Sequence, residues 1–105
     1  MIDWDRVREL RREIGAEAFE EVIDLFLEEV ETGLTALRDD MARAERADAL
    51  HFLKGSALNL GFVAFADLCE SVERGLRSAR TGEIRDCYER SRAEFLAQIG
   101  AALAA

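Results

Sequence analysis

The sequence predicts an all-α fold, an antiparallel four-helix bundle with a short additional N-terminal helix. Three observations predict this fold class. The 105 residues include no proline, the residue that breaks helices most strongly. Strong helix formers (Ala, Leu, Glu and Arg) dominate the composition. Apolar residues recur at three- and four-residue steps, and no stretch alternates as a β-strand does. One domain spanning residues 1–105 is expected, because a chain of this length can bury one core.

The first predicted helix is short. It begins after Asp3, a suitable N-cap, and ends at Gly15, which can adopt the left-handed C-cap conformation. A second helix is expected from Ala16, because its apolar positions alternate in steps of four and three, as in a bundle. This apolar seam comprises Phe19, Ile23, Phe26, Val30, Leu34, Leu37 and Met41. Gly33 costs this helix about 1 kcal/mol relative to alanine.

A turn is expected between about Met41 and Asp48, because one helix reaching to residue 60 would be unusually long. The third helix then carries His51, the only histidine, and ends near Gly61. A fourth helix follows with the apolar stripe Phe65, Leu68, Val72 and Leu76. Thr81 and Gly82 precede a fifth helix with the stripe Ile84, Tyr88, Phe95, Ile99 and Leu103. Short connections make neighbouring helices antiparallel, which predicts the four-helix bundle.

Charge and hydropathy exclude several classes of function. The net charge is -8, with 14 Lys and Arg against 22 Asp and Glu, whereas nucleic acids and anionic membrane surfaces select basic faces. No apolar run is long enough to span a bilayer. The start of the chain is acidic rather than basic and apolar, unlike a secretory signal. We therefore expect a cytoplasmic protein that binds neither nucleic acid nor membrane.

The two cysteines do not predict a metal site. Cys69 and Cys87 are 18 positions apart, and the chain lacks the paired Cys and His ligands of a zinc site. Cys69 shares a helical stripe with Phe65, Leu68 and Val72, which indicates a small core residue. Cys87 is expected to be partly exposed and reduced.

Helical spacing turns His51 away from the core. With successive residues about 100° apart, one continuous arc is apolar and is expected to be buried, and it holds Leu50, Phe52, Leu53, Ser56, Ala57 and Leu60. His51 lies near the centre of the remaining, open face. An imidazole in that position is accessible to a partner.

Three neighbours of His51 point to chemistry rather than to a merely solvated side chain. Lys54, at i+3, could neutralise an anion held on the ring. Gly55, at i+4, carries a helix penalty of about 1 kcal/mol, which suggests a need for clearance. Leu58, at i+7, exposes an apolar group suited to docking. Leu25 is a further docking candidate, although it could equally pack on the first helix.

No second catalytic group accompanies His51. The sequence contains no nucleophile–base–orienter set, no glycine-rich phosphate loop and no recognisable acid/base dyad. If His51 is reactive, it is a nucleophile whose reaction partner arrives on another protein. Imidazole is suited to this, because one ring nitrogen can attack phosphorus while a hydrogen bond holds the other.

The chain resembles histidine-containing phosphotransfer (HPt) domains in the run His51-Phe52-Leu53-Lys54-Gly55, followed by Leu58-Asn59-Leu60-Gly61. Their signature is His-x-Leu-Lys-Gly, then small residues and an Asn-Leu-Gly or Asn-x-Gly segment. The run Leu25-Phe26-Leu27 and the pairs Leu68-Cys69 and Val72-Glu73 also resemble the second and fourth helices of that family. The similarity extends over nearly the whole chain.

The resemblance implies a phosphoryl carrier without kinase activity of its own. His51 would be the phosphoacceptor, reacting through Nε2, and Lys54 would stabilise phosphoryl charge. Glu73 would hydrogen-bond Nδ1 and orient the imidazole. Gly55 and Leu58 would belong to the docking surface. The phosphoryl group would come from a receiver-domain aspartate or a histidine kinase and would pass to another receiver aspartate.

In such a transfer Mg²⁺ is bound by the receiver, and no cofactor or metal is expected on this chain. A monomer is expected, since shuttling needs no oligomer. Because the sequence begins with Met1 and has no ATP-binding or receiver pattern, we expect a free-standing shuttle. Two alternatives stay open. One is an adaptor bundle that binds a signalling partner through the same face without being phosphorylated, and the other is an autophosphorylation module of a longer kinase.

Overall fold

The computed structural model describes residues 1–104, which contain five α-helices. These helices are α1 (Trp4–Ile14), α2 (Ala16–Ala36), α3 (Arg43–Asn59), α4 (Val63–Glu73) and α5 (Thr81–Ala104). The described residues include no β-strand, only an isolated bridge between Ile2 and Phe62. The all-α prediction is confirmed.

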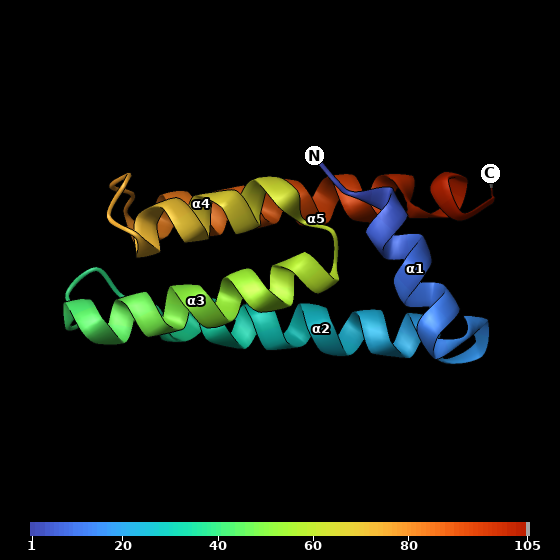
Figure 1. Cartoon of the computed structure of the whole chain (residues 1–105), viewed down its shortest axis with the longest axis horizontal. Coiled ribbons are helices and arrows are strands. Elements are labelled where there is room, and N and C mark those ends of the chain that lie inside the picture. Colours follow the sequence, from blue (N-terminus) through green and yellow to red (C-terminus); the bar gives the residue numbers. More distant parts are fainter. Residues whose placement is uncertain (105) are drawn as a thin grey trace.

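The helices form an elongated molecule with principal extents of 42 × 21 × 18 Å. Figure 1 shows α2 and α3 side by side along the long axis, with α4 and α5 forming a second layer beside them. The chain reverses its direction at each connection from α2 to α5. The shorter helix α1 crosses one end of this arrangement, near the start of α2 and the end of α5. As predicted, α1 begins with an Asp3 cap, whose Oδ1 accepts a hydrogen bond from the Arg6 amide at 3.2 Å.

Aromatic side chains occupy the middle of the core. Phe62 and Phe95 have ring centroids 5.4 Å apart in an edge-to-face arrangement, and Trp4 of α1 stacks on Phe95 at 5.5 Å. Tyr88 is also buried, and its hydroxyl donates to Glu31 Oε2 at 2.6 Å. Burial, followed by this hydrogen bond, raises the pKa of Tyr88. The aromatic residues therefore join α1, α5 and the segment between α3 and α4.

The connection between α3 and α4 is short and depends on Gly61. This glycine has a φ of +72°, and its carbonyl accepts a hydrogen bond from the Asp3 amide at 2.8 Å. A Cβ at this position would lie 2.6 Å from the Asp3 carbonyl oxygen. Phe62, the next residue, is fully buried. The turn thus ties the start of the chain to the α3–α4 pair.

The turn between α2 and α3 begins earlier than the sequence predicts. Helix α2 ends at Ala36, Leu37 is extended with φ -74° and ψ 130°, and α3 begins at Arg43. Arg85 of α5 explains this end, because its Nη2 donates to the carbonyls of Leu34 at 2.8 Å and Leu37 at 3.0 Å. Arg85 and Leu34 are 51 positions apart, so no local sequence pattern predicts this contact.

Several predicted burial assignments differ from the structure. Leu76 is 75% exposed, because α4 ends at Glu73 and the left-handed Gly75 turns the chain away. Cys87 is buried rather than partly exposed, because α5 packs on α4. Phe26 is only partly buried, and Leu27, the neighbouring residue on α2, takes its core position.

Cys69 is buried, as predicted. Burial raises the pKa of its thiol to about 12. Burial also raises the pKa of the Cys87 thiol.

Replacing Gly61 with alanine should destabilise the protein by roughly 2 to 4 kcal/mol, because a side chain disfavours the left-handed conformation and would displace the backbone at Asp3. Urea unfolding followed by circular dichroism measures this change. Gly82→Ala is the matched control, since a Cβ there meets nothing within 4 Å. It should leave stability unchanged or raise it by up to about 1 kcal/mol. Equal effects of the two substitutions would contradict this account of the turn.

Candidate functional site

His51 lies on the outer face of α3. The side chain is 67% exposed, whereas its neighbours Leu50 and Leu53 are almost completely buried. The predicted orientation of His51 is therefore confirmed. The apolar residues on the other face fix α3 in the core, so the imidazole contributes little to that packing.

Phe52 was expected in the buried arc and is 46% exposed. The reason is the close approach of α2 to α3 at Gly33. A Cβ on Gly33 would lie 2.9 Å from Leu53 Cδ2 and 3.7 Å from Phe52 Cε2. Leu53 fills the space between the helices, and Phe52 lies over the edge of α2 instead of inside. Gly33 thus has a packing role that offsets its cost to the helix.

A hydrogen bond to Glu73 of α4 fixes the His51 ring. His51 Nδ1 and Glu73 Oε2 are 3.0 Å apart. A carboxylate group can only accept a hydrogen bond, so in this contact Nδ1 carries the proton. In the neutral ring, Nε2 then keeps a free lone pair. The arrangement presents a nucleophilic nitrogen on an exposed face.

Lys54 turns from the open face of α3 toward α4. Its Nζ lies 3.7 Å from Glu70 Oε1 and 4.0 Å from Glu73 Oε1, and its side chain is only 22% exposed. Glu73 Oε1 is buried and has no hydrogen-bond partner among the described residues. The nearby ammonium therefore offsets some of the cost of burying that oxygen.

Gly55 and Leu58 remain on the open side of α3. A Cβ on Gly55 would meet nothing within 4 Å, so no packing within residues 1–104 requires a glycine there. Leu58 is 49% exposed and lies on the same helical row as His51. The structure thus brings together His51, Lys54 and Glu73, and it leaves Gly55 and Leu58 open beside them.

An apolar groove lies between α2 and α3, next to this row. Its volume is about 460 Å³. Leu25, which is 57% exposed, lines it together with Phe52. The other lining residues are Glu28, Glu29, Thr32, Gly33 and Ala36. Leu25 therefore does not pack on α1 but belongs to an exposed surface, and the groove extends the apolar area around His51.

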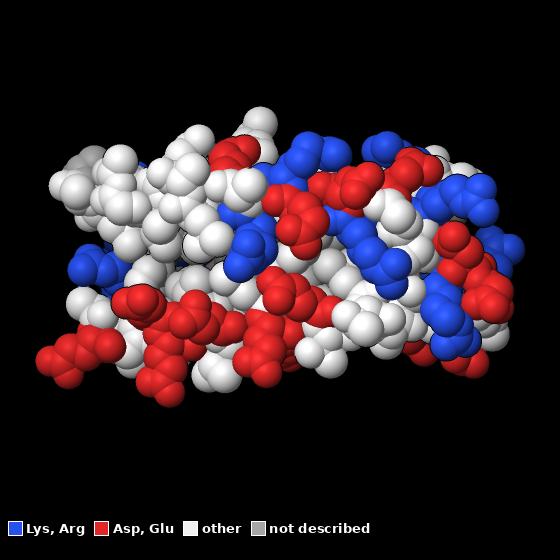
Figure 2. Space-filling model, turned by 180° about the vertical axis from the view of Figure 1, so that it is seen from behind, with Lys and Arg blue, Asp and Glu red and all other residues white. Residues whose placement is uncertain are grey.

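Helix α2 gives this side of the molecule a strong negative charge. Its 21 residues include no Lys or Arg, and its acidic residues are Glu17, Glu20, Glu21, Asp24, Glu28, Glu29 and Glu31. Figure 2 shows acidic side chains gathered along the edge of the molecule that α2 forms. In this view most basic side chains lie away from that acidic edge, over the other helices.

Sequence reasoning missed two residues of this site. Phe52 was assigned to the core, and Glu70 received no role. A carboxylate on an acidic, exposed helix gives no signal by itself. Only the register of α4 on α3 reveals that Glu70 meets Lys54.

Residues 1–104 contain neither a cluster of metal-ligating side chains nor a helix that could span a membrane. No group of three or more His, Cys, Asp and Glu residues in this range is arranged to hold a metal ion. None of the five helices is both long and apolar enough to cross a membrane.

Comparison with known proteins gives one match. The family model described as Hpt domain matches residues 21–105, which is most of the chain. No curated protein and no solved structure matches significantly. The matched range includes α2 to α5 and all the residues placed around His51.

Replacing His51 with glutamine should change the free energy of unfolding by less than about 0.5 kcal/mol, because the ring is exposed and contributes little to the core. Chemical denaturation of the two proteins tests this. A loss of several kcal/mol would show that the ring supports the fold.

Proposed function

Because this chain belongs to the Hpt domain family, we propose that it carries a phosphoryl group on His51 within a two-component phosphorelay. Members of the family are phosphocarrier modules for histidine phosphotransfer rather than kinases. The donor is a receiver aspartate or a histidine kinase, and the acceptor is another receiver aspartate. In this proposal, helices α2 to α5 act as an antiparallel four-helix bundle that holds the histidine outward, and the chain acts as a monomer.

One observation carries the proposal. His51 is exposed, and its Nδ1 is hydrogen-bonded to Glu73 at 3.0 Å, which leaves Nε2 free. An imidazole held in this way is ready to attack a phosphorus atom presented by another protein.

The transfer balances without any further reactant. Nε2 of His51 donates its lone pair to phosphorus, and the P–O bond to the receiver aspartate breaks. The aspartate leaves as a carboxylate, while the ring keeps the Nδ1 proton and becomes positively charged. The Glu73 carboxylate stabilises this imidazolium. Transfer to the next receiver is the same step in reverse, with Mg²⁺ held by the receiver.

Lys54 and Gly55 are proposed to serve the reacting phosphoryl group. The Lys54 ammonium, one helical turn from the ring, would offset negative charge on the phosphoryl oxygens. Gly55 would leave space for the receiver to approach Nε2, since a side chain there has no neighbour to pack on.

The exposed apolar residues around the groove support a docking role. Leu25 and Phe52 expose apolar area beside the His51 row, and Leu58 exposes it on the row itself. A transient partner must leave after transfer, so a small interface of about 1,200 Å² is expected. The same surface would suit an unphosphorylated adaptor, and the experiment below separates the two functions.

The test is incubation with ³²P-labelled receiver domains. We expect label on the chain that is acid-labile and alkali-stable, which is typical of phosphohistidine. The variant His51→Gln should fold normally and accept no label. Receivers that bind the chain without ever transferring label would support the adaptor function instead.

The variant Lys54→Ala should slow transfer, because the phosphoryl oxygens lose a nearby positive charge. Its stability should change by at most about 1 kcal/mol, as for weak ion pairs near a surface. Quench-flow measurement of the transfer rate tests this. Rates equal to those of the unmodified protein would remove Lys54 from the mechanism.

The variant Gly55→Gln should weaken receiver binding, because its side chain would occupy the approach to Nε2. The helix itself should be unchanged or more stable by up to about 1 kcal/mol. Titration calorimetry with a receiver, next to an unfolding curve, measures both quantities. Receiver affinity that stays normal would count against the clearance role.

A further inference from the structure

The ammonium of Lys54 faces two carboxylates of α4. Glu70 Oε1 is 3.7 Å from Nζ, and Glu73 Oε1 is 4.0 Å away. Both contacts are longer than a hydrogen bond, and Nζ donates no hydrogen bond within residues 1–104. The ammonium is therefore attracted to α4 but not fixed there.

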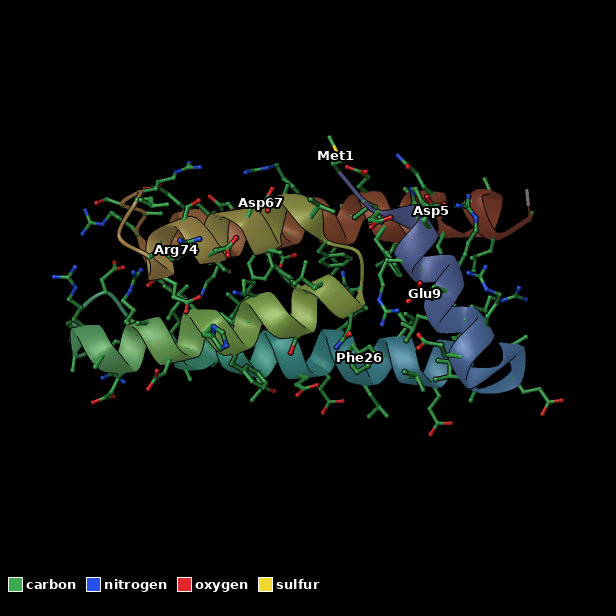
Figure 3. All side chains as sticks on the ribbon, in the orientation of Figure 1. Met1, Asp5, Glu9, Phe26, Asp67 and Arg74 are labelled. Atoms are coloured by element: carbon green, nitrogen blue, oxygen red, sulfur yellow. The ribbon has the colours of Figure 1, made fainter. Side chains whose placement is uncertain are left out.

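The two carboxylates are not equivalent. Glu73 already accepts the Nδ1 proton of His51, and its side chain is 21% exposed. Glu70 is more exposed, at 43%, and forms no hydrogen bond or ion pair with the ring. Within residues 1–104 its carboxylate forms ion pairs with Lys54 and with Arg74, whose Nη1 is 3.8 Å away. Figure 3 shows Arg74 near the end of α4. Of these two partners of Glu70, the Lys54 side chain is the more buried, at 22% exposed against 65% for Arg74.

We infer that Glu70 is a positioning residue that holds the Lys54 ammonium beside α4 and so limits how strongly it stabilises a phosphoryl group on His51. This inference rests on the function proposed above. Glu73 is needed to orient the ring, whereas Glu70 acts on the phosphoryl group only through Lys54.

A carrier gains from such a restraint. A phosphoryl group on Nε2 brings up to two negative charges, and an unrestrained ammonium would hold it more tightly. Since the next receiver must remove that group, excess stabilisation would slow the second transfer. A loose ion pair to Glu70 divides the attraction of Lys54 between α4 and the phosphoryl group.

The experiment uses phosphoramidate as donor, so that no receiver is needed. Nε2 of His51 attacks phosphorus, the P–N bond breaks, and ammonia leaves with the bonding electrons. Intact-protein mass spectrometry follows the rate of phosphorylation, with His51→Gln as the blank. The test variant is Glu70→Gln, which keeps the side-chain shape and removes its charge.

Two matched variants isolate the role of Lys54. Asp67→Asn removes the same charge from the same helix, but Asp67 is exposed and forms no ion pair within residues 1–104. Figure 3 shows Asp67 on the edge of α4 away from α3. The double variant Lys54→Ala with Glu70→Gln completes a double-mutant cycle with Lys54→Ala alone.

We expect His51 in the Glu70→Gln variant to be phosphorylated about two- to five-fold faster than in the unmodified protein. This factor corresponds to the free energy that exposed ion pairs contribute. Asp67→Asn should match the unmodified protein. In the Lys54→Ala background, Glu70→Gln should have no effect.

The inference is overturned by an unchanged rate in Glu70→Gln, by an equal gain in Asp67→Asn, or by a gain that persists without Lys54. Failure of labelled receivers to transfer to His51 is a separate result, which would overturn the proposed function.

Discussion

The short connection between α3 and α4 is the constraint on which the site depends. His51 lies eight residues before the end of α3 at Asn59, and Glu73 lies ten residues after the start of α4 at Val63. With a rise of 1.5 Å per residue, these segments are about 12 and about 15 Å long. Since only three residues join the two helices, the chain returns beside itself and both side chains reach the same level. The left-handed Gly61 makes so short a return sterically possible.

Helix α3 separates stability from chemistry by using two faces. Leu53 and Ala57 are completely buried and fix the helix in the core, whereas His51 is exposed on the opposite side. The site reduces stability at α4, where Glu73 Oε1 is buried without a hydrogen bond among the described residues. An oxygen in that state costs about 1 to 3 kcal/mol when it has no compensation. The other oxygen of the same carboxylate, Oε2, lies 3.0 Å from His51 Nδ1, so this cost accompanies the hydrogen bond that orients the ring.

Much of the fold follows from periodicity, and several of the errors share one cause. The sequence predicts five helices, the Asp3 cap and an outward His51, because each depends on residues within a few turns. It misplaces Phe52 and Cys87, because their burial depends on which helix lies opposite.

The residues of the site also fall into those that local sequence suggests and those that depend on how helices pack. A helical wheel finds His51, and resemblance to the HPt family is what suggests Glu73. Nothing local suggests Glu70, whose contact with Lys54 exists only through the register of α3 on α4. The parts that could not be predicted are thus the contacts between helices.

Two glycines inside helices show why coordinates are needed to interpret a helix penalty. By propensity, Gly33 and Gly55 cost their helices the same, about 1 kcal/mol each. A Cβ on Gly33 would lie 2.9 Å from Leu53, so close packing of α2 on α3 accounts for that glycine. A Cβ on Gly55 would meet nothing within 4 Å, so packing inside the described chain does not account for it. The proposed docking of a receiver would give this glycine a role, because a partner that approaches over Gly55 would reach the free nitrogen of His51 one helical turn away.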